Sequence, residues 1–326
     1  MNTHFDLIVL GSGSGARDGA NKARLEFGAN VALVENTRWG GSCPNVACKP
    51  TKAYVVVSDL VHDVNTLADK LGIEAGEARA NLARVKARKD SLIVPREVWM
   101  ERLRSAGHEP FDGTGAFLDS HTVQVNGGRI SAERILVATG SRTAVPPIEG
   151  LDEVGWIDHV TALELTELPE SLLVVGGGPV GLELAQIFSR FGSRVVIVQQ
   201  PDRIAPRSDP TATDELHAAL VEEGIEIRTG STVSRVRRED GDIVATLGDD
   251  ELRVARILLA SGRVPNVELL DLDQVGIERN RAGITVDDRL RTSLDGVWAS
   301  GDVTGVLPFT PIAQYQARVA VEDMFG

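Results

Sequence analysis

The segment that decides the fold is LIVLGSGSGARDGANKARLEFGANVALVE, at residues 7–35. An apolar run is followed by a glycine-rich turn, a stretch typical of a helix, and a second apolar run that ends at Glu35. In such a turn the backbone N–H groups can approach a pyrophosphate at the positive end of a helix, without side chains in the way. The pattern therefore predicts a βαβ unit that binds a dinucleotide.

The residues of this turn are Gly11, Gly13, Gly15 and Ala16. Ala16 is small enough for close helix packing, and Glu35 lies about where the acidic residue of this fingerprint accepts hydrogen bonds from a ribose hydroxyl. A flexible loop is the alternative for any lone glycine-rich turn. Here the strands, the helix and the acid around the turn all favour the dinucleotide site.

The same pattern occurs again at residues 171–199, where GGGPVG supplies Gly176, Gly178 and Gly181. One chain is thus expected to hold two dinucleotides. The fold class predicted is α/β, with two Rossmann-like dinucleotide-binding domains.

The second strand of the second unit ends at Gln199 rather than at an acid. This removes the carboxylate that would repel a 2′-phosphate, and Arg203 and Arg207 follow closely. NADPH is therefore slightly favoured over NADH. The alternative is that both arginines are solvated surface charges.

Composition bounds the function classes. A chain of 326 residues is long enough for two domains. Lys plus Arg total 34 against 47 for Asp plus Glu, a net charge of −13, which argues against nucleic acid and anionic lipid as partners. The opening residues resemble no signal peptide and no apolar run is long enough for a membrane span, so a cytoplasmic location is expected.

The rest of the chain divides between helical and strand patterns. Apolar residues at helical spacing over residues 52–107, including Leu60 and Leu71, predict two long helices. Alternating segments over 110–138 and after residue 225 predict strands. Pro146-Pro147 and the RVPN segment at 263–266 indicate crossings between domains.

The only cysteines, Cys43 and Cys48, lie five positions apart. A regular helix would separate their Cα atoms by about 7.5 Å along its axis, so a bond between them requires a distorted turn, which Pro44 favours. Pro50 suits the first turn of a following helix, whose positive end, with Lys49 and Lys52 nearby, should stabilise a Cys48 thiolate. The alternatives are an inert cysteine pair and, less in keeping with only two thiols, a zinc site; no metal is expected.

With these residues in place, GGSCPNVACKPTK at 40–52 resembles the redox segment of the class I pyridine nucleotide-disulfide oxidoreductases, which include lipoamide dehydrogenase, glutathione reductase and mercuric reductase. The resemblance continues along the chain through further segments. These are ILVATGS at 135–141, VVGGGPVGLELA at 174–185, LASGRVPN at 259–266 and VWASGDVTG at 297–305.

The resemblance implies that FAD occupies the first unit and NAD(P)H the second. Cys48 would be the charge-transfer thiol against the flavin and Cys43 the interchange thiol that meets the substrate. Lys52 would lie beside the flavin N5 and pair with Glu183. The alternative for Asp302 is a carboxylate that only stabilises a turn. The alternative for Lys52 and Glu183 is a pair of unrelated surface charges.

Further cofactor-binding residues carried over by the resemblance lie in several segments. For FAD they are Gly41, Ser42, Ala138, Thr139, Gly140, Asp302, Ala313 and Gln314, and for the nucleotide Gly262 joins the second turn. The implied domains are an FAD-binding domain at 1–145 and 265–326, with an NAD(P)-binding domain at 146–264 inserted in it.

The chain also departs from the family pattern. Pro179 stands where glutathione reductase-like members carry a tyrosine, which makes glutathione a doubtful substrate. Family members continue into a C-terminal dimerisation domain of about a hundred residues that carries a catalytic His and Glu pair. That domain is expected to be absent here, with a homodimer expected for a full-length form.

Three functions are weighed on these grounds. The first is an enzyme that passes a hydride from NAD(P)H through FAD to the Cys43–Cys48 disulfide and on to a small-molecule or disulfide substrate. The second is a binding module for FAD and NAD(P) with diaphorase activity only. The third is an enzyme of the first kind whose acceptor is a metal ion.

Overall fold

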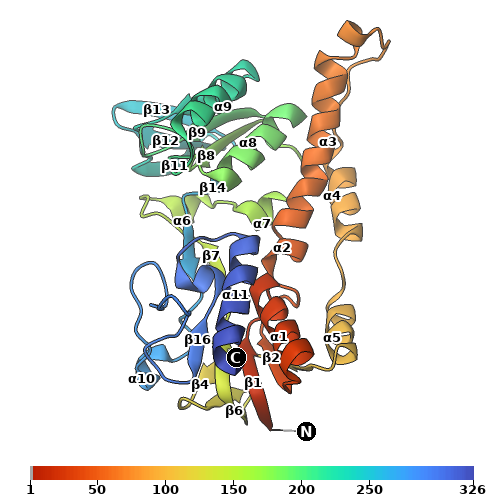
Figure 1. Ribbon diagram of the computed structural model, residues 1–326. Helices are drawn as coiled ribbons and strands as arrows, with labels where there is room; N and C mark the ends of the chain where they lie inside the picture. The colour runs from red at the N-terminus through yellow and green to blue at the C-terminus, as the bar shows by residue number, and fades with distance from the viewer. Residues whose placement is uncertain (1–2) are drawn as a thin grey trace. The chain divides into compact units, whose positions relative to one another are not determined.

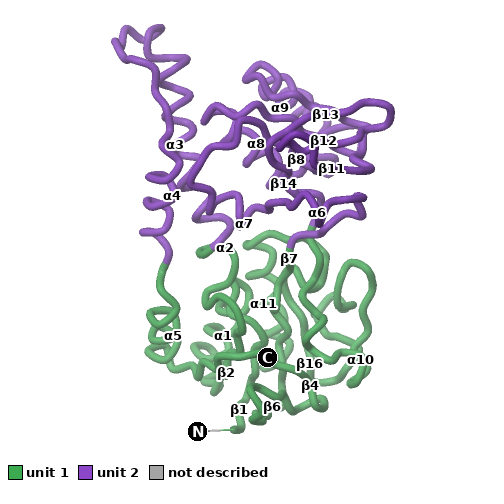
Figure 2. Tube along the Cα trace, turned by 180° about the vertical axis from the view of Figure 1, so that it is seen from behind, with its two compact units in different colours: residues 1–45, 94–142, 263–326 green, residues 46–93, 143–262 purple. Residues whose placement is uncertain are grey.

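The computed structural model describes residues 3–326, and the chain forms two compact units (Figure 2). Among the described residues, unit 1 comprises 3–45, 94–142 and 263–326, and unit 2 comprises 46–93 and 143–262. These units are defined by contacts within the chain. The predicted domains are instead defined by the cofactor each is expected to bind, FAD for 1–145 and 265–326 and NAD(P)H for 146–264. This assignment of cofactors stays a prediction.

Unit 1 is built on a seven-stranded sheet in which β1 (His4–Leu10) is central (Figure 1). The strand order is β3 (Glu109–Asp112), β2 (Val31–Glu35), β1, β6 (Gly128–Val137), β5 (Thr122–Val125) and β4 (Gly115–Phe117), with β16 (Val297–Ala299) also paired to β6. The pairs β1–β2, β1–β6, β2–β3 and β6–β16 are parallel, whereas β5 runs antiparallel to both β4 and β6. A parallel sheet brings the carboxyl ends of its strands to one edge, where dinucleotides bind in open α/β sheets.

The alternation of side chains along β1 divides the core of unit 1 into two layers. Leu7 and Val9 face α1 (Ser14–Phe27) and α11 (Thr310–Phe325), whereas Ile8 and Leu10 face the opposite side. Small residues on the helices, such as Ala20, let α1 and α11 lie side by side over the sheet (Figure 1). The predicted first βαβ unit is therefore present.

The other elements of unit 1 complete the sheet and its connections. They are β2 (Val31–Glu35), α2 (Ser42–Asn45), α5 (Arg96–Ser105), β3 (Glu109–Asp112), β4 (Gly115–Phe117), β5 (Thr122–Val125), β6 (Gly128–Val137), β15 (Arg263–Pro265), α10 (Leu272–Val275), β16 (Val297–Ala299) and the 3₁₀ turn Gly301–Thr304. Strand β7 (Ser141–Thr143) lies where the chain passes from unit 1 to unit 2.

Unit 2 contains a four-stranded parallel sheet in the order β10-β9-β8-β14 and a three-stranded antiparallel sheet β11-β12-β13. The second predicted βαβ unit is β8 (Ser171–Val175), α8 (Pro179–Phe191) and β9 (Arg194–Val198). Its other elements are α6 (Leu151–Val154), α7 (His159–Ala162), α9 (Pro210–Glu222), β10 (Glu226–Arg228), β11 (Arg235–Glu239), β12 (Asp242–Leu247), β13 (Asp250–Val254) and β14 (Arg256–Leu259).

The prediction of two long helices over residues 52–107 is wrong. The structure has one long helix, α3 (Cys48–Thr66), followed by a 3₁₀ turn (Asp69–Leu71) and two shorter helices, α4 (Leu82–Ser91) and α5. Gly72 ends the first stretch in a left-handed conformation, and Pro95 separates α4 from α5. Leu60 and Leu71 are 63% and 71% exposed, so their spacing did not identify the buried face.

Helix α3 instead packs on α8 through another face. Tyr54 is fully buried and its hydroxyl donates to the Leu163 carbonyl oxygen at 2.9 Å. Its ring centroid lies 6.3 Å from that of Phe191 on α8. These contacts place residues 46–93 in unit 2. Across residues 3–326, no helix is both long and apolar enough to cross a bilayer.

Candidate functional site

The first glycine turn joins β1 to α1, and its three glycines have different surroundings. Gly11 has φ +112°, and a Cβ there would lie 2.3 Å from the carbonyl oxygen of Ala138. A Cβ at Gly15 would lie 2.7 Å from the carbonyl oxygen of Ala313 on α11. At Gly13, by contrast, nothing lies within 4 Å of the Cβ position. The backbone of Gly13 is therefore open to a ligand.

The second glycine turn, in unit 2, repeats this construction. Gly176 has φ +115°, and its Cβ would lie 2.4 Å from the Ala260 carbonyl oxygen. A Cβ at Gly181 would lie 2.0 Å from the Gly176 carbonyl oxygen, whereas nothing lies within 4 Å of that position at Gly178. In each turn, one glycine thus allows the positive φ of a tight turn, one allows close packing, and one leaves the backbone open to a ligand, as in dinucleotide-binding turns.

Glu35 braces the first turn from the end of β2. One carboxylate oxygen accepts from the Ser12 N–H at 3.1 Å and the Ser12 hydroxyl at 2.7 Å. The other accepts from the Thr37 N–H at 2.8 Å, the Thr37 hydroxyl at 2.9 Å and the Arg38 N–H at 3.2 Å. Glu35 is 9% exposed. These bonds give the side chain a structural role, and its acceptance of a ribose hydroxyl stays a prediction.

Gln199 occupies the corresponding place at the end of β9. Its side-chain oxygen accepts from the Gly177 N–H at 2.7 Å, and the residue is buried. Because this bond uses the amide oxygen, the amide NH₂ is the part of the side chain left to face a ligand as a donor.

The predicted arginines of the second site differ in their surroundings. Arg203 donates to Asp214 at 2.7 Å, an ion pair in which the aspartate side chain is 68% exposed. Arg207 is exposed. Gly262 has φ +143°, and its Cβ position lies 3.8 Å from the Cβ of Ala144. The structure therefore brings neither arginine into a buried cluster with the glycine turn.

The segment of the first cysteine lies directly on the first glycine turn. Gly41 has φ +76°, and a Cβ there would lie 2.4 Å from the Cα of Gly13. The short helix α2 begins at Ser42, and Cys43 is partly buried on it. Asn45 donates to the Gly41 carbonyl oxygen at 2.7 Å, which closes this turn on itself. Gly13, Gly41, Ser42 and Cys43 are thus brought together in unit 1.

The second cysteine begins α3 in unit 2. Cys48 is exposed at the first position of the helix, and Pro50 is buried in its first turn. Ala47, with φ −126° and ψ −105°, interrupts the helical path between the cysteines, as predicted. Cys43 and Cys48 belong to different units, so their pairing stays a prediction.

The predicted ion pair of Lys52 with Glu183 is present within unit 2, between α3 and α8. The two side chains are 66% and 32% exposed. Ion pairs with this exposure contribute little to stability because water screens them. The main effect of the pair is therefore to fix the position of the Lys52 ammonium group, and its contribution to the stability of the fold is small.

The remaining predicted FAD residues lie in unit 1. Asp302 accepts from the Ser141 hydroxyl and lies 3.5 Å from Arg263 Nε. Thr139 donates its hydroxyl proton to the Asn266 carbonyl oxygen at 2.7 Å. These contacts tie two distant segments, residues 263–266 and the turn at Asp302, to the residues that follow β6.

The other residues of this set surround the first turn or follow it. Ala138 and Ala313 face Gly11 and Gly15, as described above, and Ala16 is fully buried. Gly140 has φ +72°, and Gln314 is partly buried on α11. Their contacts with a cofactor stay predictions.

Two polar residues that support the site were not predicted. Ser12 donates to Glu35 and accepts from the Gly40 N–H at 3.0 Å, which links the glycine turn to the cysteine segment. Gln316 is buried on α11 and accepts from the Gly301 N–H at 2.7 Å, next to Asp302. A small polar residue between glycines was the one sequence signal for Ser12, and Gln316 had none.

Asp323 anchors the far end of α11. Its carboxylate accepts from Arg291 Nε and Nη2 at 2.5 and 2.6 Å, from Trp298 Nε1 at 3.0 Å and from Arg289 at 3.1 Å. The hydrogen bonds from Arg291 are the largest effect and lower the pKa of Asp323 to about 2. The carboxylate therefore stays ionised near neutral pH and holds α11, which carries Ala313.

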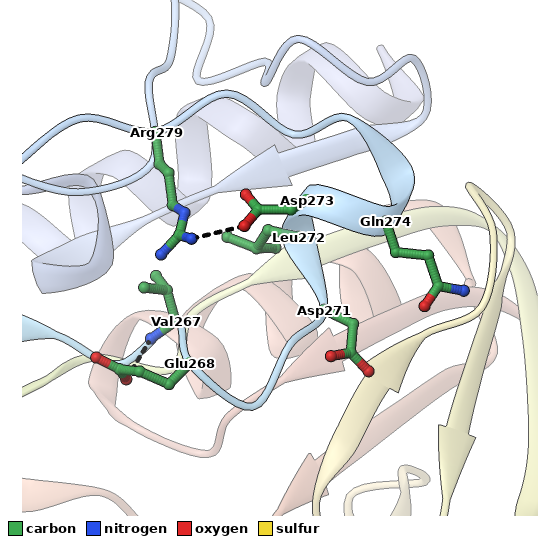
Figure 3. Close-up of a pocket in the computed structure, with 7 residues that line it drawn as sticks. All are labelled: Val267, Glu268, Asp271, Leu272, Asp273, Gln274 and Arg279. Atoms are coloured by element: carbon green, nitrogen blue, oxygen red, sulfur yellow. Dashed lines mark hydrogen bonds and ion pairs between the residues drawn. The ribbon is translucent and has the colours of Figure 1, made fainter.

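A separate pocket in unit 1 contains none of the predicted site residues (Figure 3). Its volume is about 150 Å³, below the several hundred Å³ of ordinary small-molecule sites. The lining is polar, and Arg279 is paired with Asp273 at 2.9 Å across it. It is lined by Val267, Glu268, Asp271, Leu272, Asp273, Gln274 and Arg279.

Among the residues described, no group of three or more His, Cys, Asp or Glu side chains could hold a metal ion.

Comparison with curated proteins finds relatives over nearly the whole chain. A mercuric reductase of Streptomyces lividans is 37% identical over 334 residues, which cover 99% of this chain and 70% of the relative. A mercuric reductase of Lysinibacillus sphaericus is 32% identical over 331 residues, covering 99% of this chain and 60% of the relative. The chain thus spans less than two thirds of the length of several relatives that it matches.

A solved structure and a family model also match nearly the whole chain. The HOCl-induced flavoprotein disulfide reductase RclA of Escherichia coli matches with a TM-score of 0.87 and 30% identity, over 98% of this chain and 71% of that one. This likeness and the two glycine turns establish a Rossmann-like α/β fold. The family model described as pyridine nucleotide-disulphide oxidoreductase matches residues 5–317. The chain therefore belongs to the pyridine nucleotide-disulphide oxidoreductase family.

Proposed function

We propose that this chain is the electron-transferring part of an FAD-dependent NAD(P)H:disulfide oxidoreductase. Unit 1 would bind FAD, and residues 146–264, nearly all of which lie in unit 2, would bind NAD(P)H. The observation that carries this proposal is the repeated turn, with an open backbone position at Gly13 and another at Gly178. The cysteine segment packs on the first of these turns through Gly41, which gives that turn a redox partner.

The residues present fit a flavin dinucleotide at the first turn. A Cβ at Gly13 would fill the open space, so glycine keeps that approach free for a pyrophosphate. Ala138 and Ala313 would line the site beside it, with Asp302 near the ribityl chain. When bound, FAD would supply the two-electron chemistry that no side chain of this protein can perform alone.

The two cysteines would act as the carrier between cofactor and substrate. Two electrons break the Cys43–Cys48 S–S bond and leave two sulfurs, each as thiolate or thiol according to the available protons. Transfer of the pair to a disulfide acceptor reverses this change and reduces the acceptor to two thiols. Lys52, held by Glu183, would place a positive charge where negative charge develops on reduction.

NADPH is the preferred donor in this proposal because of Gln199. A carboxylate there would accept hydrogen bonds from a 2′-hydroxyl and repel a 2′-phosphate. The Gln199 oxygen is used by Gly177, so its NH₂ would donate to a phosphate. Arg203 and Arg207 would add positive charge on the exposed side.

The Gln199→Glu variant tests this preference. It is expected to lower kcat/KM for NADPH by about tenfold or more through charge repulsion, while kcat/KM for NADH changes little or rises. Steady-state rates with both nucleotides and a quinone acceptor measure the ratio. An unchanged NADPH to NADH ratio would show that Gln199 does not face the 2′ position.

The acceptor is a small disulfide or a metal ion. The similar mercuric reductases and the similar flavoprotein disulfide reductase represent the metal-ion and disulfide classes. The experiment that tests the proposal is purification of the chain with FAD, followed by NADPH oxidation with a quinone, a panel of small disulfides and Hg(II). A protein that cannot be reconstituted with FAD contradicts the proposal. A protein that reduces quinone but neither disulfides nor Hg(II) would have diaphorase activity only.

A further inference from the structure

Asp302 lies at the same edge of the unit 1 sheet as the first glycine turn. It follows β16, whose carboxyl end shares this edge with that of β1 because both strands run parallel to β6. A Cβ at Gly301 would lie 3.1 Å from the Cβ of Ala313, and a Cβ at Gly15 would lie 2.7 Å from the carbonyl oxygen of the same Ala313. Gly15 of the turn and the residue before Asp302 thus pack on one residue of α11.

The two oxygens of the Asp302 carboxylate have different surroundings. Oδ2 accepts the proton of the Ser141 hydroxyl and lies 3.5 Å from Arg263 Nε. Within residues 3–326, no hydrogen bond reaches Oδ1, although the side chain is only 23% exposed. The carboxylate therefore has one oxygen committed to protein donors and one left as an acceptor.

Arg263 fixes the direction of these bonds. Its Nε donates to the Ser141 hydroxyl oxygen at 2.6 Å, and its Nη2 donates to the Ser141 carbonyl oxygen at 2.7 Å. Because arginine can only donate, the Ser141 hydroxyl oxygen accepts from Arg263, and its single proton goes to Asp302. Hydrogen bonds that involve a charged group are the stronger kind, so this chain of three side chains holds the carboxylate firmly.

A link between the chain segments alone would not require this arrangement. Arg142, beside Ser141, already donates to the Pro265 carbonyl oxygen at 3.0 Å and to Glu268 at 2.6 and 3.0 Å. These bonds join the same segments of the chain, and none of them reaches Asp302. The bond from Ser141 therefore adds a hold on the carboxylate rather than a further link between segments.

The order of the strands decides which part of a dinucleotide Asp302 meets. β2, which ends at Glu35, lies on one side of β1, whereas β6 and β16 lie on the other side (Figure 1). A dinucleotide whose pyrophosphate lies at the turn after β1 extends along the sheet edge in both directions. With the adenosine ribose on the Glu35 side, the hydroxyl groups on the Asp302 side are those of the ribityl chain.

We propose that Ser141 and Arg263 are positioning residues for the flavin half of FAD. By occupying Oδ2 of Asp302, they leave Oδ1 as the oxygen that accepts from a hydroxyl of the ribityl chain. The inference deepens the proposed function and rests on FAD as the ligand of the first glycine turn. A carboxylate that is already held in place loses less conformational entropy when the ligand binds, which favours affinity.

The test measures the Kd of FAD for the flavin-free chain by fluorescence titration, and the Ki of ADP as a competitor of FAD. Ser141→Ala and Arg263→Met are each expected to raise the Kd of FAD about tenfold. ADP carries the ribose and pyrophosphate without a ribityl chain, so its Ki should stay within about twofold of the parent value. Competition with FAD reports the first turn alone, even if ADP also binds at the second.

Asp302→Ala supplies a second measurement. Ser141→Ala added to it should raise the Kd of FAD by less than about twofold further, because a residue that acts through a carboxylate has no effect once the carboxylate is gone. Arg142→Met is the matched control, since it removes bonds between the same segments. It should leave the Kd of FAD and the Ki of ADP within about twofold of the parent values.

Three results would overturn the inference. They are an unchanged Kd of FAD in Ser141→Ala, equal losses of FAD and ADP affinity in that variant, and additive effects of Ser141→Ala and Asp302→Ala. Any of them in a chain that binds FAD contradicts the inference alone. A parent chain that binds no FAD contradicts the proposed function and the inference with it.

Discussion

Cys43→Ser and Cys48→Ser are each expected to lower NADPH-dependent reduction of a disulfide acceptor by about a thousandfold or more. Serine cannot form the S–S bond that stores the electron pair between cofactor and acceptor. Reduction of a quinone, which needs no thiol, should stay within about twofold of the parent rate in both variants. Absorbance of NADPH at saturating quinone and at saturating disulfide measures the two rates.

The double variant is the control for this result, because these are the only two cysteines of the chain. Residues that act as a unit lose activity together, so Cys43→Ser with Cys48→Ser should be no slower than either single change. A single variant that kept most of its disulfide turnover would remove the cysteine pair from the mechanism. Loss of both activities would instead point to lost cofactor or lost fold.

The repeated glycine turns could be predicted from the sequence because their construction is local. Gly11 and Gly176 take nearly the same positive φ, a conformation that most side chains resist. The strand before the turn and the helix after it follow from apolar patterning within thirty residues. The turn can therefore be identified without knowing Ala138 and Ala313, the distant residues that it packs against.

The region after the cysteines shows where patterning fails. Leu60 and Leu71 have helical spacing but are exposed, whereas Tyr54 and Ser58 are buried. The buried face of α3 is chosen by α8, which lies more than a hundred residues later in the chain. A periodic pattern describes one helix and does not contain the position of its partner.

The supporting residues were missed for the same reason. Ser12 acts through Glu35 and Gly40, and Gln316 acts through Gly301. The contact of the Arg17 guanidinium group with the Trp99 ring likewise joins residues 82 positions apart, although Arg17 looks in the sequence like any helix-surface arginine. Such roles come from tertiary contacts, and only the fold brings the partners together.

Gly13→Asp and Gly178→Asp are each expected to weaken dinucleotide binding at one glycine turn without lowering the stability of the fold. Both positions precede a helix, with φ and ψ of −63° and −174° at Gly13 and −84° and 178° at Gly178. These are extended angles that aspartate adopts readily at a helix N-cap, and an aspartate there should keep or raise stability by up to about 1 kcal/mol. Thermal unfolding of the protein without ligands checks this part.

Binding should change in the opposite direction. The new carboxylate would occupy the open position and repel a pyrophosphate, so the affinity of the affected site should fall by about a hundredfold or more. Gly13→Asp should lose FAD and Gly178→Asp should lose NADPH, as measured by flavin content and by NADPH titration.

Each variant serves as the control for the other, because the change and the local geometry are the same. Gly181→Val would not serve, since its Cβ would meet the Gly176 carbonyl oxygen at 2.0 Å and disturb the turn itself. If Gly178→Asp kept its NADPH affinity with an intact fold, the second turn would not hold the pyrophosphate. The open space at Gly178 would then need another occupant, and the symmetry between the two turns would be structural without being functional.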